Sequence, residues 1–302
     1  MMKMRWFLLF VALTSMALAQ SDLELEVLQR TNQERIQRGL RALQWDHTAY
    51  KAALGHAADM LRRNFFAHLN PEGRDAAWRM RQAGVMDVTT GENLASFENY
   101  QDAELPRRSV VGWMNSPPHR KNMLEPEYTH LGVAFVRQGN KVMVVQNFIG
   151  RLFEASIGSS PAQVQRDVLV LSGNASGTVG IFLGSGLYQR LNPPINARLE
   201  LPPGASVRYG LFDGQTWWNT KPGERGLQIR TRLEVSTVAG RVVSLSLPAG
   251  QFNLALGEQP RFWQALNGPI SFNTSLAGSL EALWIGQRRG NEVVYAYRIP
   301  LR

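Results

Sequence analysis

The chain has 302 residues, with 33 Lys and Arg against 24 Asp and Glu and a formal net charge of +9. Hydrophobic residues make up 44% of it, which excludes a disordered or collagen-like chain, and the length suggests about two domains. Because the sequence contains no Cys, it has no disulfide framework, no thiol nucleophile and no Cys-ligated metal site. The positive balance indicates an anionic partner.

Residues 1–19 have the features of a secretory signal peptide. A basic start is followed by an apolar stretch from Trp6 to Leu13, too short to span a bilayer, and by small residues at Ala17 and Ala19. We therefore predict cleavage after Ala19. The mature protein would be secreted to the periplasm or the extracellular space, without a lipid anchor or a transmembrane segment. A retained membrane anchor is the alternative.

Apolar residues recur at helical spacing from Asp22 to about Gly84 and predict three helices. Asp46 is a suitable N-cap for the second helix, and Gly84 is a suitable end for the third. A fourth helix is expected from Leu105 to Met114, ended by the pair of prolines that follows. Two strands, Leu131–Arg137 and Val142–Phe148, then form a hairpin. This order predicts a mixed α and β domain over residues 20–153.

The chain changes character after this domain. Residues 154–165 are rich in Ser, Gly and Pro, and we expect a linker there. Residues 166–302 consist of short apolar strands separated by Gly, Pro and Asn, which predicts an all-β domain of the sandwich or barrel type. The predicted fold class is therefore α+β, with most of the excess positive charge on the β region.

All five His lie between residues 47 and 130. His47 and His56 are nine residues apart on the second predicted helix, so they would not share a ligand sphere, and we expect surface or helix-capping roles. The remaining candidates border turns next to apolar elements, which is where folds gather functional sites. They are His68, Glu92, Asn93, His119, Glu127 and His130.

Four motifs around these residues resemble the CAP superfamily (cysteine-rich secretory proteins, antigen 5 and pathogenesis-related 1), in particular its bacterial SCP-like branch. The resemblance covers roughly residues 23–150 and does not reach the β region. The motifs are Phe65-Phe66-Ala67-His68, Gly91-Glu92-Asn93-Leu94-Ala95, Trp113-Met114-x-Ser116-Pro117-x-His119-Arg120-x-Asn122-Met123-Leu124 and Tyr128-Thr129-His130-Leu131-Gly132-Val133.

The resemblance implies an α-β-α sandwich with a central cleft that, in eukaryotic members, holds two His and two Glu and in some members a divalent metal. By motif, His68 matches the first His and Glu92 the first Glu. The other two positions depart from the pattern, because Ser116 and Glu127 stand where the family has Glu and His. We expect His119 to supply the second imidazole and Glu127 the second carboxylate.

Two imidazoles and one or two carboxylates can hold Zn²⁺ with water, so His68, Glu92 and His119 are candidate metal ligands. The ligands are scattered, however, and no His-Glu-x-x-His helix positions a pair of them. The structural alternative is that Glu92 and His68 hydrogen-bond each other and tie loops across the cleft.

Other chemistries find little support. A serine hydrolase is disfavoured because no complete nucleophile elbow is present, and the short basic clusters lack the aromatic platform of a specific nucleic-acid site. Trp217 and Trp218 lie at a predicted turn, where they would bind a surface ligand if exposed and pack between sheets if buried.

The expected function is binding. The CAP cleft would hold a lipid or another cell-envelope component, and the basic β domain would attach to an anionic surface polymer. Two alternatives remain open: a zinc-dependent hydrolase of peptide or cell-wall bonds using His68, Glu92 and His119, and a structural adhesion protein of the envelope.

Overall fold

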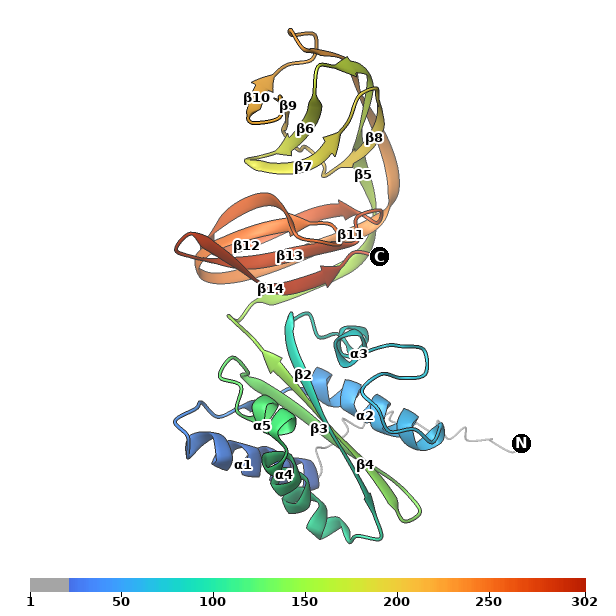
Figure 1. The fold of residues 1–302 in the computed structure, drawn as a ribbon, viewed down its shortest axis with the longest axis vertical. Coiled ribbons are helices and arrows are strands. Elements are labelled where there is room, and N and C mark those ends of the chain that lie inside the picture. The colour runs from blue at the N-terminus through green and yellow to red at the C-terminus, as the bar shows by residue number, and fades with distance from the viewer. Residues whose placement is uncertain (1–21) are drawn as a thin grey trace, which may run out of the picture.

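The computed structural model describes residues 22–302, and in it an N-terminal α/β domain is followed by two lobes built from strands (Figure 1). The predicted signal peptide, residues 1–19, lies outside the described residues. Within residues 22–302, no helix is long and apolar enough to cross a membrane.

The N-terminal domain is a four-stranded sheet in the order β1-β3-β4-β2, with helices on both faces. Only the β1–β3 pair is parallel. The predicted helices and hairpin are present, and the α-β-α arrangement is confirmed. The elements are α1 (Asp22–Ile36), β1 (Gln44–Trp45), α2 (His47–Arg62), α3 (Ala76–Ala83), β2 (Thr89–Glu98), a 3-10 turn (Asp102–Glu104), α4 (Leu105–Asn115), α5 (Pro117–Met123), β3 (His130–Gln138) and β4 (Lys141–Gly150).

Local sequence explains where α2 and α3 begin and end. The Asp46 side chain accepts hydrogen bonds from the amides of Thr48 and Ala49, which caps the first turn of α2. Asp75 caps α3 in the same way, and Gly84 ends it with a φ of 104°, in the left-handed region that glycine adopts without strain.

Each face of the central sheet has its own apolar core. Residues on one face of β3 and β4 pack with Trp113 of α4 and Met123 of α5. On the opposite face, Ala134 and Val145 pack with Met60 of α2. Period-two alternation on the two central strands therefore separates the two layers of helices.

The region after residue 155 is all-β, as predicted, but it forms two lobes with separate cores. The proximal β lobe, next to the N-terminal domain, contains β12–β14 and the adjoining ends of β5 and β11; the distal β lobe contains β6–β10 and the other ends of β5 and β11 (Figure 1). The strands are β5 (Ser156–Ala175), β6 (Thr178–Leu183), β7 (Gly186–Leu191), β8 (Ile195–Leu201), β9 (Val207–Phe212), β10 (Trp217–Thr220), β11 (Leu227–Leu256), β12 (Arg261–Ala277), β13 (Ala282–Arg289) and β14 (Glu292–Pro300).

The linker predicted at residues 154–165 is wrong from residue 156 onward. That segment is the first half of β5, which pairs in continuous register with β11 from Ser156 opposite Ser246 to Ala175 opposite Leu227. Small polar residues are compatible with a strand whose backbone is satisfied by a long partner. The actual connection between the N-terminal domain and the β region is the short segment Arg151–Ala155.

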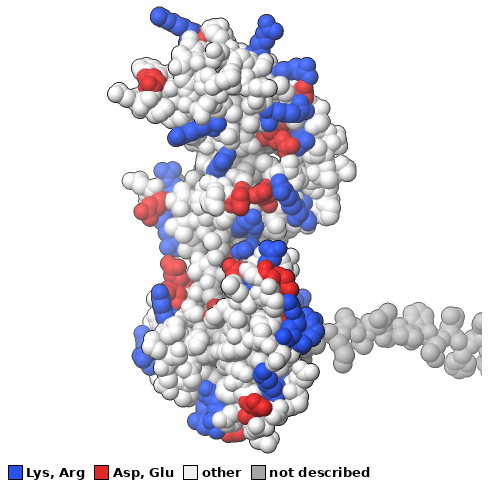
Figure 2. Space-filling model, turned by 45° about the vertical axis from the view of Figure 1, so that its right-hand side comes forward, with Lys and Arg blue, Asp and Glu red and all other residues white. Residues whose placement is uncertain are grey.

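Charge is distributed along the whole molecule. On the face shown in Figure 2, Lys and Arg side chains occur on both β lobes and on the N-terminal domain, with Asp and Glu between them. No single basic patch dominates this face.

The N-terminal domain and the proximal β lobe share backbone hydrogen bonds. The segment between α3 and β2 runs beside β14, so that the amide of Val88 donates to the carbonyl of Ala296 at 2.9 Å. The amide of Arg298 in turn donates to the carbonyl of Met86 at 2.8 Å. Met86 packs against the core of the proximal lobe. Residues 86–88 and β14 are therefore hydrogen-bonded to each other like two neighbouring strands of a sheet.

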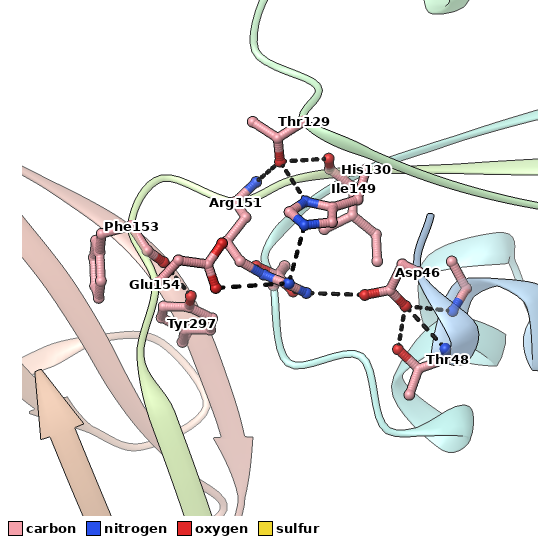
Figure 3. Close-up of polar contacts among 11 residues, drawn as sticks. Asp46, Thr48, Thr129, His130, Ile149, Arg151, Phe153, Glu154 and Tyr297 are labelled. Atoms are coloured by element: carbon pink, nitrogen blue, oxygen red, sulfur yellow. Dashed lines mark hydrogen bonds and ion pairs between the residues drawn. The ribbon is translucent and has the colours of Figure 1, made fainter. Parts of the chain in front are cut away.

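Arg151 forms the polar centre of this junction (Figure 3). Its guanidinium donates to both carboxylate oxygens of Asp87, at 3.2 and 3.0 Å, and to Asp46 at 3.1 Å. Burial acts to lower the pKa of Arg151, but Asp87 and Asp46 outweigh it and raise that pKa above its ordinary value. Beside it, the Tyr297 hydroxyl donates to the carbonyl of Phe153. One cation thus neutralises two acidic groups where the chain passes between domains.

We predict that Arg151→Met lowers the free energy of unfolding by about 3 kcal/mol, because it leaves the buried Asp87 without its cation. The measurement is urea-induced unfolding of the whole chain, followed by circular dichroism.

Arg137→Met is the matched control, because Arg137 pairs with Asp102 on the surface. A surface pair contributes about 1 kcal/mol or less. Equal losses in the two variants would contradict the role given to Arg151.

Candidate functional site

His68 lies on the loop between α2 and α3, and two side chains beneath the loop hold it in place. The ring Nε2 of His56 is 3.0 Å from the carbonyl oxygen of Ala67. The Arg79 guanidinium donates to the carbonyl of His68 at 2.9 Å and to that of Arg74 at 2.8 Å. The backbone at Ala67 is therefore anchored to α2, and the backbone at His68 is anchored to α3.

Glu92 links this loop to the central sheet. It lies on β2, and its side chain is only 3% exposed. One carboxylate oxygen is 2.8 Å from Nδ1 of His68, and the other accepts a hydrogen bond from Arg79 at 2.7 Å. Since a carboxylate accepts and does not donate, Nδ1 of His68 carries the proton in this pair. The Nε2 atom of the neutral ring is then an acceptor, on a side chain that is 56% exposed.

His119 is the second imidazole of the site and is held by α5. Prolines occupy the first two positions of α5, where their missing amide hydrogens are not needed. The Nδ1 atom of His119 is 2.9 Å from the Ser116 hydroxyl oxygen. Burial lowers the pKa of His119, and the nearby charge of His68 lowers it further. The lowered pKa favours the neutral form of the His119 imidazole, which lies close to His68.

A chain of amide side chains supports the site from below. Asn93, fully buried, donates to the His119 carbonyl at 3.2 Å and to Gln146 Oε1 at 3.1 Å. Asn122 donates to the Glu92 carbonyl and to Asn93 Oδ1, both at 3.0 Å. Gln146 continues the chain to Thr31 on α1. Asn93, a predicted cleft residue, therefore positions its neighbours and is itself inaccessible.

The structure places Glu127 and His130 away from this group. Glu127 is exposed and lines a hollow of about 340 Å³ between the N-terminal domain and the proximal β lobe, together with Arg41 and Tyr295. His130 is buried, with Nε2 3.3 Å from an Arg151 nitrogen and Nδ1 2.8 Å from the Thr129 hydroxyl (Figure 3). Both belong to the domain junction, because the turn before β3 lies against the end of β4.

The arrangement does not fit a metal centre. Among residues 22–302, no group of three or more His, Asp or Glu is placed to hold a metal ion. The Glu92 oxygens are both engaged, and Glu127 lies elsewhere. His68 and His119 are then the only remaining members of the proposed ligand set, one fewer than the three protein ligands typical of a catalytic zinc site.

The two tryptophans of the distal lobe differ in environment. Trp217 packs against Phe182 and Phe212. Trp218 is 57% exposed, and its ring nitrogen donates to Asp213 at 2.6 Å. Of this pair, Trp218 is the one available at the surface.

His56 has a larger role than the surface or capping position expected for it. It is 1% exposed, and its Nδ1 atom has no hydrogen-bond partner among the described residues. Burial lowers its pKa, while the charges of Glu92 and Arg79 act in opposite directions. The helical spacing of Ala49, Ala53, His56 and Met60 places it on the buried stripe of α2, a signal the sequence contains.

The lowered pKa values of His56, His119 and His130 make the free energy of unfolding depend on pH. A folded-state pKa below the unfolded value means that the folded protein binds fewer protons. The stabilising contribution is complete above about pH 6.5, the ordinary pKa of His, and is lost as the pH falls through the lowered folded pKa. We predict that His56→Gln, which keeps a donor for Ala67, reduces the slope of the unfolding free energy against pH below about pH 6.5.

The slope is not expected to vanish, because burial also lowers the pKa of His119 and of His130. An unchanged slope in urea unfolding curves of His56→Gln would show that His56 does not titrate differently in the two states.

Comparisons with known proteins find relatives of the N-terminal domain. Residues 28–148 match the profile of the cysteine-rich secretory protein family, CAP. The chain is 38% identical over 138 residues to the uncharacterised protein YkwD of Bacillus subtilis, covering 46% of this chain and 51% of that protein. It is 37% identical over 132 residues to the uncharacterised membrane protein YlbC of the same organism, covering 44% and 36%.

Among solved structures, an extracellular SCP-domain protein from Bacillus anthracis is 31% identical, with a TM-score of 0.37 and coverage of 42% of this chain and 40% of that one. The chain thus spans about half or less of the length of these relatives. The profile match ends at residue 148, before β5 begins.

Proposed function

The chain carries a domain of the cysteine-rich secretory protein family at residues 28–148, and we propose that this domain binds an amphiphilic cell-envelope molecule without catalysing a reaction on it. The protein would act outside the cytoplasm after export. The neighbouring β lobes would hold it near an anionic surface polymer.

The hydrogen bonds and the burial of the Glu92 carboxylate are the observation that supports this proposal. Each Glu92 oxygen is within 2.8 Å of His68 or Arg79, and the side chain is only 3% exposed, so a metal or a substrate would have to displace one of these partners to reach the carboxylate. The Arg79 side chain is only 10% exposed, so this ion pair is shielded from solvent. Glu92 therefore orients His68 and leaves the exposed Nε2 atom to hydrogen-bond a ligand.

Apolar side chains beside His68 indicate the class of ligand. Phe66 is 51% exposed and Leu69 is 54% exposed, on the same loop. Large apolar side chains held at the surface on the loop that carries His68 suit a molecule with a polar head and a hydrocarbon part. A lipid or a lipid-linked wall precursor has this character.

The attachment role of the β lobes is based on their charge. From residue 154 onward the sequence contains 14 Lys and Arg and 9 Asp and Glu. Because the cations on the visible face are dispersed, they favour long-range attraction to an anionic polymer over recognition of one small anion. Exposed Trp218 is the feature that supports the adhesion alternative.

The zinc-hydrolase alternative leads to a direct prediction. We expect the purified protein to contain well under about one zinc per chain after zinc loading at neutral pH, because the site lacks a third protein ligand. Elemental analysis of the wild type, His68→Ala and His119→Ala measures this. About one zinc per wild-type chain, lost in both variants, would contradict the proposal and favour a metal centre.

A binding test addresses the ligand class. We predict that the double variant Phe66→Ser/Leu69→Ser weakens binding of a fluorescent lysophosphatidylethanolamine by about tenfold or more, because apolar contact area is lost. The probe is used below its micellar concentration. The measurement is made at high salt, which screens the attraction between the phosphate of the probe and the basic β lobes.

The control is Ile36→Ser, which removes an apolar side chain that is 60% exposed at the end of α1. Equal weakening in the control, or no binding by the wild type, would contradict the proposed ligand class.

A further inference from the structure

Part of β11 is an open edge of the distal β lobe. From Gln228 to Val238 this strand pairs with β5 on one side only. On its other side, β12 joins from Gly240 onward, and the carbonyl of Ala239 accepts a hydrogen bond from Gly278. Within the described chain, no strand pairs with that side of residues 228–238. Its backbone groups on that side are therefore available to another strand.

This edge lacks two of the features that usually protect one, proline and a bulge, although it carries charged side chains at Arg230, Arg232 and Glu234. It contains no proline, and its register with β5 runs without a bulge from Leu227 to Ser246. Leu233 and Val235 point to the same face, and each is 57% exposed. A long, regular edge with exposed aliphatic side chains favours pairing with another chain.

The charged residues of this edge indicate which partner strand would pair with it. Arg232 and Glu234 flank Leu233 and lie on the opposite face of the strand. If a second copy pairs antiparallel with a two-fold axis at Leu233, Arg232 of each copy stands opposite Glu234 of the other. Leu233 then stands opposite Leu233 of the second copy, and Val235 stands opposite Thr231 of the second copy. We propose that the protein forms a symmetric dimer through the β11 edge in this register.

Neighbouring registers are less favourable. Moving the axis by one residue toward the N-terminus places Arg232 opposite Arg232, and moving it toward the C-terminus places Glu234 opposite Glu234. Like charges directly opposite each other on adjacent strands destabilise pairing, and opposite charges stabilise it. The Arg-Leu-Glu order therefore selects the axis at Leu233.

The position of β12 sets the length of the pairing. An added strand would continue the row that β12 occupies beside β11 from Gly240. With the axis at Leu233, the ladder runs from Ile229 to Thr237 before it reaches the turn at Gly278. This length is typical of strand pairs within globular domains.

The first measurement is the mass of the full chain by sedimentation equilibrium at increasing concentration. We expect the wild type to reach the dimer mass. Arg232→Glu and Glu234→Arg are each expected to raise the dimer dissociation constant at least tenfold, because each places like charges opposite each other.

Mixing the two variants tests the register and excludes misfolding as the cause. In a mixed pair every 232–234 contact again joins opposite charges, so the mixture is expected to recover the dimer that neither variant forms alone. The double variant Arg232→Glu/Glu234→Arg is expected to dimerise as well.

Arg241→Glu is the control, since Arg241 lies on the same strand but is paired on both sides. It is expected to leave the dimer unchanged. A wild type that stays monomeric at about millimolar concentration would overturn the proposal and leave the edge to an extended segment of another protein. A mixture that fails to recover the dimer would overturn the register.

Discussion

The carboxylate of Glu92 is the constraint on which the candidate site depends. It is buried on β2, where an unpaired charge would be costly, and it is stabilised by Arg79 on one side and His68 on the other. Because Arg79 also holds the loop backbone, one ion pair fixes both the position and the orientation of the exposed imidazole. The same arrangement covers the carboxylate, so that a metal or a substrate would reach it only after His68 or Arg79 moved.

A second buried ion pair determines how the molecule is assembled. Arg151 stands where the N-terminal domain gives way to the β region, and it satisfies Asp87 and Asp46 together. The backbone bonds between residues 86–88 and β14 add a strand-like contact. The candidate site and the β lobes therefore belong to one connected structure. This connection matters for the proposal, because attachment through the β lobes would also fix the position of the ligand site.

Much of the N-terminal domain could be predicted from sequence, because its helices have clear apolar periodicity and caps such as Asp46 and Gly84. Strand β2 was missed: Thr89–Glu98 lacks regular alternation and is a strand because β4 pairs with it along its whole length. The composition of residues 156–165 indicated a linker for a similar reason, since pairing with a strand some 80 residues away in sequence leaves no local signal. The sequence does not reveal α5, because a pair of prolines also suits the end of a helix, whereas here the two prolines begin one.

At the site, the structure brings Glu92 within hydrogen-bond distance of His68, with His119 nearby, and it places Glu127 and His130 at the domain junction, which motif spacing could not predict. Those two residues are close to the motifs in sequence and are turned toward a second domain that no local pattern reveals. Arg79 was missed altogether. Its role is visible only in three dimensions, because this cation on α3 reaches both the loop carbonyls and the carboxylate of Glu92 on β2.

Glu92 orients the His68 ring, and in the proposed function the Nε2 atom of His68 hydrogen-bonds a ligand and holds no metal. The most direct test is the nitrogen-15 NMR spectrum of the histidine rings, recorded before and after addition of zinc. This arrangement predicts that His68 is protonated at Nδ1 when neutral and that one equivalent of zinc leaves the Nε2 resonances of His68 and His119 unchanged. A His68 ring protonated at Nε2, or stoichiometric zinc shifts at both rings, would contradict it.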